Sequence, residues 1–171
     1  MSGTIKFFHP EETFVYQVDK SFCKVVYLRK KNCLVLEIES TESLDHLAED
    51  SLQNEFPKVV FSVDDFPIDV ENKKKLPGKT YEIPESTVEV EDEEGEVEEV
   101  FYTNLSVNED DFEVNNNELK FSTSKSGKLH LVWTGEVEDF TEETDELIRF
   151  EVKCSLIDKK IELREESFHE A

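Results

Sequence analysis

Residues 118–140 read ELKFSTSKSGKLHLVWTGEVEDF, and this stretch decides the fold class. Apolar and polar residues alternate on both sides of a turn near residues 125–127, a pattern typical of two antiparallel strands in a hairpin. Leu129, Leu131 and Trp133 share one face of the second strand. We therefore expect Trp133 in the core of a β-sheet protein rather than on the surface as a platform for sugar binding.

The same period of two recurs along most of the chain. Residues 147–157 alternate cleanly, with Ile148 and Phe150 on the inward face. One stretch, residues 42–56, departs from this period of two. Its leucines are spaced as in an amphipathic helix, which predicts a short helix near 43–54. Further strands or hairpins are predicted at 13–18, 22–40, 57–68 and 161–165. About ten short strands with one helix predict a mainly-β fold, either an antiparallel sandwich or an open barrel.

A chain of 171 residues fits one domain of ordinary size. The polar loop at 69–80, with a turn at Pro77-Gly78, is the best candidate for an internal division. Each half alone has few strands for a closed core, so we expect a single domain over 1–171. The tail at 166–171 is expected to fray.

Negative charge is concentrated in one part of the sequence. The formal net charge is −23, and residues 80–119 contain 15 acids and no base. A field of this sign repels nucleic acid and anionic lipid and attracts basic proteins or cations. We therefore expect a basic protein as the partner and expect binding neither to nucleic acid nor to a membrane.

The acidic segment 88–104 reads VEVEDEEGEVEEVFYTN, and it is predicted to form a hairpin around Glu94-Gly95. Its valines pair across the two arms only if one extra residue remains on the return arm, so we predict a β-bulge at Glu98-Glu99. Glutamates that lie directly opposite each other should weaken the hairpin by up to ~1 kcal/mol per pair. The predicted pairs are Val90 with Val97 and Val88 with Val100, and the predicted anchors of the hairpin base are Phe101, Tyr102 and Leu105.

The sequence carries none of the patterns that support catalysis. Its four histidines and three cysteines lack the spacing of metal ligands, and it has no GxSxG, P-loop or GxGxxG motif. We therefore predict no catalytic residue, no metal site and no cofactor, and we expect His130 to be an ordinary, partly exposed strand histidine. Cys23 and Cys154 are expected to be small buried hydrophobes in a reducing compartment. Without a signal peptide or an apolar run of membrane-spanning length, a soluble cytoplasmic protein is expected.

Two further patterns have alternative interpretations. Residues 108–118 read NEDDFEVNNNE, which either forms two Asx-rich turns or binds Ca²⁺ at Asp110 and Asp111. Three basic clusters fall in predicted turns, where we expect solvated charges rather than anion sites. These clusters are 29–31, 73–75 and 159–160.

These observations favour a non-catalytic protein-binding module. The form that we expect is an immunity or antitoxin-like inhibitor that covers the cationic groove of a basic toxin. Two alternatives remain, a carbohydrate- or calcium-binding β-sandwich and an enzyme with dispersed site residues, and the acidic surface can also serve solubility alone. The predicted partner-binding residues are Glu89, Glu91, Glu93, Glu94, Glu96, Glu98, Glu99 and Tyr102.

Overall fold

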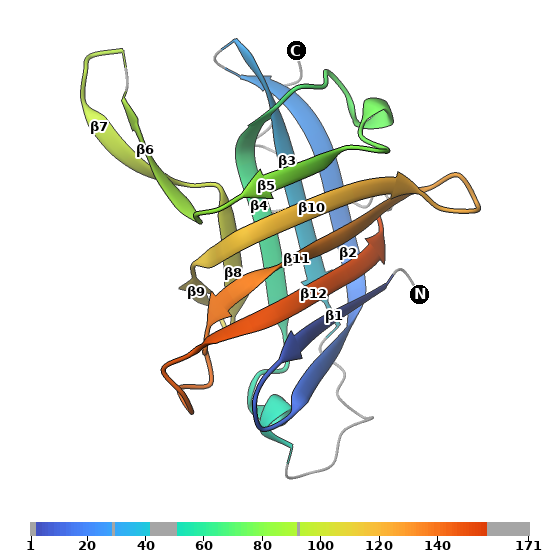
Figure 1. Cartoon of the computed structure of the whole chain (residues 1–171), viewed down its shortest axis with the longest axis vertical. Helices are drawn as coiled ribbons and strands as arrows, with labels where there is room; N and C mark the ends of the chain where they lie inside the picture. Colours follow the sequence, from blue (N-terminus) through green and yellow to red (C-terminus); the bar gives the residue numbers. More distant parts are fainter. Residues whose placement is uncertain (1–2, 29, 42–50, 92, 157–171) are drawn as a thin grey trace.

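The computed structural model describes residues 3–28, 30–41, 51–91 and 93–156 (Figure 1). Over these residues the chain is mainly β, as predicted, and its strands form two antiparallel sheets. The larger sheet has ten strands and curls into a half-barrel. The smaller sheet is a two-stranded hairpin that extends from one end of the half-barrel.

The strands of the half-barrel come from both ends of the described chain. They are β1 (Gly3–Phe8), β2 (Thr13–Leu28), β3 (Lys31–Ser40), β4 (Val59–Ile68), β5 (Thr80–Ile83), β8 (Thr103–Val107), β9 (Asp110–Phe112), β10 (Val114–Thr123), β11 (Leu129–Glu138) and β12 (Leu147–Ser155). The hairpin comprises β6 (Thr87–Glu91) and β7 (Val97–Phe101), and two short 3-10 turns are η1 (Leu52–Glu55) and η2 (Lys73–Lys75).

The order of strands across the large sheet is β5-β10-β11-β12-β1-β2-β3-β4-β8-β9. β1 therefore lies between β12 and β2, where Ile5 pairs with both Val152 and Tyr16. On the other side, β4 pairs with β8. Strands that precede and follow the loop 69–80 thus belong to one sheet. The turn at Pro77-Gly78 is present as predicted.

Aromatic side chains from several strands of the half-barrel pack against one another in the core. The ring centroid of Phe61, on β4, lies 4.7 Å from that of Phe150 and 5.1 Å from that of Trp133. Trp133 is fully buried, which confirms its predicted core position. The predicted hairpin 118–140 corresponds to β10 and β11, and the predicted alternation in 147–157 corresponds to β12 with Ile148 and Phe150 buried.

Only the end of the predicted helix near 43–54 can be compared, because residues 42–50 lie outside the described ones. The described part is the 3-10 turn η1 rather than an α-helix. Glu12 holds this turn by accepting hydrogen bonds from Ser51 Oγ at 2.5 Å and Leu52 N at 2.7 Å. Gln53 is buried and pairs with Val15, accepting from its N–H at 2.9 Å and donating to its carbonyl at 2.7 Å. The strand predicted at 161–165 and the tail at 166–171 lie outside the described residues.

Candidate functional site

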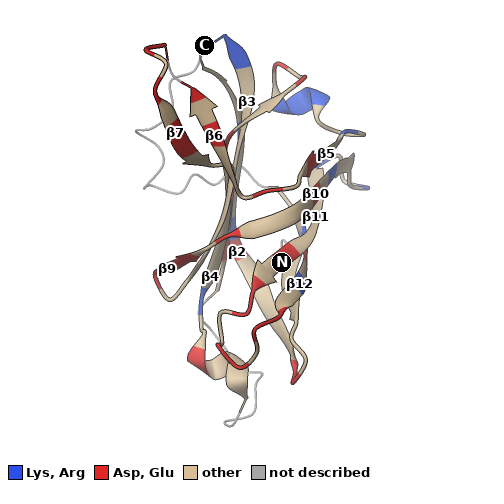
Figure 2. Cartoon of the chain, turned by 60° about the vertical axis from the view of Figure 1, so that its left-hand side comes forward, with Lys and Arg blue, Asp and Glu red and all other residues tan. Residues whose placement is uncertain are grey.

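The acidic hairpin β6–β7 is the most distinctive surface element of the protein. Its two strands form a separate two-stranded sheet, which projects beyond the end of the half-barrel (Figure 1). In Figure 2 the acidic positions are marked in red along both arms and in the adjoining turn. All seven glutamates predicted to bind a partner are exposed, and they are Glu89, Glu91, Glu93, Glu94, Glu96, Glu98 and Glu99.

The predicted β-bulge at Glu98-Glu99 is wrong. Pairing runs without a register shift from Thr87 opposite Phe101 to Glu91 opposite Val97. The extra residue therefore belongs to the connection between the strands, where Gly95 adopts a left-handed φ of 82°. The expected pairing of Val90 with Val97 fails because neither side of β7 is buried in the core, so burial does not select the register.

The observed register gives the hairpin two unlike faces. Val88, Val90 and Val100 are half-buried on one face. The opposite face carries Glu89 directly across from Glu99, a like-charged pair of the kind that we expect to weaken the hairpin. On this acidic face Val97 is 63% exposed and Phe101 is 46% exposed. Apolar contact area and negative charge are therefore combined on one surface.

A buried hydrogen-bond network fixes the base of the hairpin. Ser86, immediately before β6, is fully buried, and its Oγ donates to the carbonyl of Thr103 at 2.5 Å. The Ser86 carbonyl accepts from Tyr102 N at 2.8 Å, and Ser86 N donates to Asn115 Oδ1 at 2.8 Å. The two ends of the hairpin are thus tied to each other and to β10.

Asn117 extends this network into the core. Its Nδ2 donates to the carbonyls of Ile83 at 2.9 Å and Val114 at 2.8 Å, and its Oδ1 accepts from Trp133 Nε1 at 2.8 Å. Thr103 Oγ1 also donates to the Val114 carbonyl at 2.8 Å. Because Thr103 is on β8 and Val114 is on β10, side-chain hydrogen bonds join the two sides of the curled sheet beside the hairpin.

The aromatic residues at the hairpin base have different environments. Tyr102 is half-buried, with its ring centroid 5.3 Å from that of Phe66. Burial, with a smaller contribution from Cys33, raises the pKa of the Tyr102 hydroxyl. Leu105 is fully buried, whereas Phe101 is exposed. The base is therefore anchored by Tyr102 and Leu105, and the prediction that Phe101 anchors it is wrong.

The structure also brings together a histidine and an aspartate that the sequence did not indicate as a pair. His9 and Asp139 are buried, and His9 Nε2 lies 3.2 Å from Asp139 Oδ2 and 3.0 Å from Thr141 Oγ1. His9 Nδ1 accepts from Glu11 N at 3.1 Å, so the geometry assigns the ring proton to Nε2. Asp139 also accepts backbone and hydroxyl hydrogen bonds from Thr144, each at 2.9 Å.

This arrangement has the composition of a catalytic pair, but both side chains are enclosed by the protein. The side chains of His9 and Asp139 have no exposed surface, and both ring nitrogens already have partners within the protein. The contact connects the β1–β2 turn to the β11–β12 turn. The only sequence signal for it is the spacing of Asp139 and Thr141, which is typical of an Asx-type turn.

The other candidate chemical groups lie apart. His130 is half-exposed on β11 and pairs with Ser155, whereas the neighbouring Leu131 pairs with Cys154. His130 and Cys154 therefore face opposite sides of the sheet. Burial raises the pKa of the Cys154 thiol to about 12, and Cys23 is buried, as predicted.

The Asn- and Asp-rich segment forms β9 and the start of β10. Asp110 and Asp111 are exposed on β9, and Asp111 Oδ1 accepts from Asn104 Nδ2 at 2.9 Å. Among residues 3–28, 30–41, 51–91 and 93–156, no group of three or more His, Cys, Asp or Glu side chains is arranged to hold a metal ion. Over the same ranges, no helix has the length and apolar character needed to cross a membrane.

Comparison with known proteins places this chain in no family. It matches no protein-family model, no curated protein and no solved structure. The geometry of the site and its charge are therefore the basis for assigning a function.

Proposed function

We propose that this protein is a non-catalytic binding protein whose acidic hairpin, β6–β7, engages a basic protein partner. The observation that carries the proposal is the direct opposition of Glu89 and Glu99 in an element that is anchored to the core but lies outside it. A like-charged cross-strand pair costs stability. Its presence on an ordered, projecting element favours a role in binding.

The composition of the acidic face suits a protein interface. Of the seven exposed glutamates of the hairpin, Glu89, Glu91 and Glu99 lie on this face, and together the seven supply a field that accelerates association with a cationic surface. Val97 and Phe101 offer apolar contact area among these charges, and an aromatic contact surrounded by polar groups is typical of interface hot spots. Tyr102, packed against Phe66, supports the hairpin base beside this surface.

The particular form that we propose is an immunity or antitoxin-like inhibitor. Such a protein would cover the cationic substrate groove of a basic toxin, for example a nuclease, because the glutamates offer the same sign of charge as the phosphates of the substrate. The partner would then lose its activity in the complex. Inhibition of the purified partner by this protein, assayed on its own substrate, tests this form separately from binding.

Capture from native cell extract tests the proposal. The immobilised full-length protein is compared with a variant in which all seven hairpin glutamates are replaced by glutamine. The matched control neutralises seven exposed acids outside the hairpin, and they are Glu109, Asp110, Glu138, Glu142, Glu143, Asp145 and Glu146. Both variants lose seven negative charges. Any difference between them therefore reports where the charge lies on the protein and not how much charge was removed.

We expect one basic protein to be retained by the wild type and by the control variant and to be lost from the hairpin variant. Retention should decrease as the salt concentration of the wash rises. If no basic protein distinguishes the hairpin variant from the control, the acidic surface serves solubility and the proposal is wrong.

A further inference from the structure

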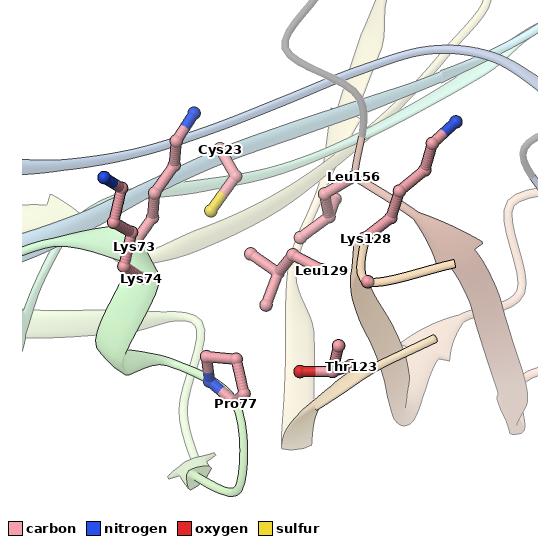
Figure 3. Close-up of a pocket in the computed structure, with 9 residues that line it drawn as sticks. Cys23, Lys73, Lys74, Pro77, Thr123, Lys128, Leu129 and Leu156 are labelled. Carbon is pink, nitrogen blue, oxygen red and sulfur yellow. The ribbon is translucent and has the colours of Figure 1, made fainter. Parts of the chain in front are cut away.

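A second feature lies apart from the acidic hairpin, in a cavity of about 520 Å³ between η2 and the β10–β11 turn (Figure 3). Its apolar lining includes Cys23 and Leu156, which are buried, Leu129, which is half-buried, and Pro77. This volume lies within the range of small-molecule sites, about 300–1,000 Å³. The cavity is therefore large enough for a small organic ligand.

The charged part of the lining is entirely cationic among the residues that the structure describes there. Lys73 and Lys74 come from η2, and Lys128 comes from the β10–β11 turn. Figure 3 shows these side chains on the two sides of the space, with Cys23, Leu129 and Leu156 between them. The site thus has an apolar floor and two cationic edges.

This charge contrasts with the rest of the molecule. The chain has 42 acids and 19 bases, yet the described lining of the cavity includes no acid. The nearby Lys75 and Lys79 are paired with Glu71 and Asp69. Lys74, in contrast, forms no ion pair within the described part of the chain, and the same holds for Lys128. The cavity is a local positive site in a strongly negative protein.

We propose that this cavity binds a small amphipathic anion, with its apolar part on Cys23, Leu129 and Leu156 and its anionic head between Lys128 and Lys74. A carboxylate on a short hydrocarbon chain is the simplest ligand of this chemical class. Burial of the chain supplies most of the affinity, and the lysines select the charge of the head. This site is independent of the acidic hairpin and of the proposed protein partner.

The first test is calorimetric titration of the full-length protein with monomeric decanoate and with decanol. These probes share the same hydrocarbon chain and differ in the charge of the head. We expect saturable binding of decanoate and binding of decanol that is weaker by about tenfold, the effect of two or three partly exposed charge contacts. Equal binding of the two probes, or no binding of decanoate, would overturn the proposal.

Matched substitutions locate the binding. The variant Lys74→Met/Lys128→Met removes both charges but keeps the aliphatic length, and we expect it to weaken decanoate binding by about tenfold. The control Lys75→Met/Lys125→Met changes one lysine in each of the same two turns, outside the lining, and should bind decanoate like the wild type. Similar losses in both variants would show that general charge, rather than this cavity, attracts the anion.

A second pair of substitutions tests the cavity without changing any lysine. Thr123 lines the cavity and is exposed, so Thr123→Glu should add a repulsive charge without disturbing the core. Ser122 is exposed next to it on β10 but does not line the cavity, and Ser122→Glu is its control. We expect the first substitution to weaken decanoate binding by about tenfold and the second to leave it unchanged. Unchanged binding by Thr123→Glu would contradict the assignment.

Vesicles of anionic phospholipid test whether the anion is a free small molecule or a lipid in a membrane. We expect no retention of the protein on these vesicles, because its net charge of −23 is repelled by an anionic surface, whereas a monomeric ligand responds to the local lysines. Binding to vesicles without binding to decanoate would replace a small-molecule site with a membrane contact and would overturn the proposal.

Discussion

Asn117 forms side-chain hydrogen bonds to residues beside the acidic hairpin. It is buried, and its amide satisfies two backbone carbonyls and the indole N–H of Trp133. A buried polar group that loses its partner costs about 1–3 kcal/mol. We therefore expect Asn117→Ala to lower the free energy of unfolding by about 3 kcal/mol, measured by denaturant titration with Trp133 fluorescence as the signal.

The exposed Ser122 on the same strand provides the control for this substitution. Ser122→Ala should change the free energy of unfolding by less than about 0.5 kcal/mol, as is usual at surface positions. An Asn117→Ala protein as stable as the Ser122→Ala protein would show that the three hydrogen bonds contribute little.

Asp139 gives the fold a defined pH dependence. Burial opposes ionisation of this carboxyl, but hydrogen bonds from Thr141 and Thr144 together outweigh burial and lower its pKa. The folded state therefore favours the carboxylate. Its contribution to stability is fully present above the unfolded-state pKa of about 3.9 and is lost as the pH falls through the lower pKa of the folded state.

We expect Asp139→Asn to cost about 2 kcal/mol at neutral pH, because the amide cannot accept all the hydrogen bonds that the carboxylate accepts. The difference between wild type and variant should narrow as the pH falls below about 4. Urea denaturation at a series of pH values measures this. A difference that stays constant from neutral pH into the acid range would contradict the assigned role of the carboxylate.

At the scale of elements, we expect charge repulsion between the two strands to lower the stability of the acidic hairpin. Glu89 lies opposite Glu99, so Glu89→Lys should replace repulsion with attraction and stabilise the hairpin by up to ~1 kcal/mol. We expect the hairpin to open locally, so the effect should appear as amide exchange in β6 and β7 that is slower by about fivefold. Hydrogen-exchange NMR measures it residue by residue.

Glu93→Lys is the matched substitution for this experiment. It makes the same charge change in the connection between the strands, where no residue of the other strand is directly opposed. We expect it to slow exchange much less than Glu89→Lys does. Equal effects of the two substitutions would assign the change to overall charge and would contradict the cross-strand repulsion.

Sequence patterns predicted the elements that bury one face and missed the features that depend on distant contacts. The alternation in 147–157 and the hairpin 118–140 were predictable because the core selects which residues of β10, β11 and β12 point inward. In the acidic hairpin the pairing of Val88 with Val100 was predicted correctly, but the pairing of Val97 with Glu91 was not, because the β7 strand packs no face in the core. The contact between His9 and Asp139 joins residues 130 positions apart, which periodicity does not reveal.

At the scale of the whole molecule, charge repulsion limits stability. A net charge of −23 disfavours the compact state, and salt screens this repulsion. We expect the thermal unfolding temperature to rise from low to moderate sodium chloride concentration. The rise should be smaller for the variant with seven hairpin glutamines, because it has less charge to screen. A decrease with salt, measured by calorimetry, would contradict this account.

The overall architecture could be predicted only as far as its class. The sequence supports many antiparallel strands, but the half-barrel depends on β1 lying between β12 and β2 and on the contact of Thr103 with Val114. The first brings together strands from opposite ends of the described chain, and the second joins two strands that are not neighbours in the sheet. Local alternation predicts neither contact, because it is the same in a sandwich and in an open barrel. The acidic hairpin was predictable as a site of charge, but its anchoring through Ser86 was not.

The central claim is that the position of charge on β6–β7 drives binding to a basic protein. Its most direct test is the association rate constant of the captured partner, measured by stopped-flow mixing with three proteins, the wild type, the seven-glutamine hairpin variant and the variant neutralised outside the hairpin. We predict that the wild-type rate falls steeply with salt and that the hairpin variant associates at least about tenfold more slowly than the control variant at low salt. Equal association rates for the two variants, with the same salt dependence, would contradict the claim.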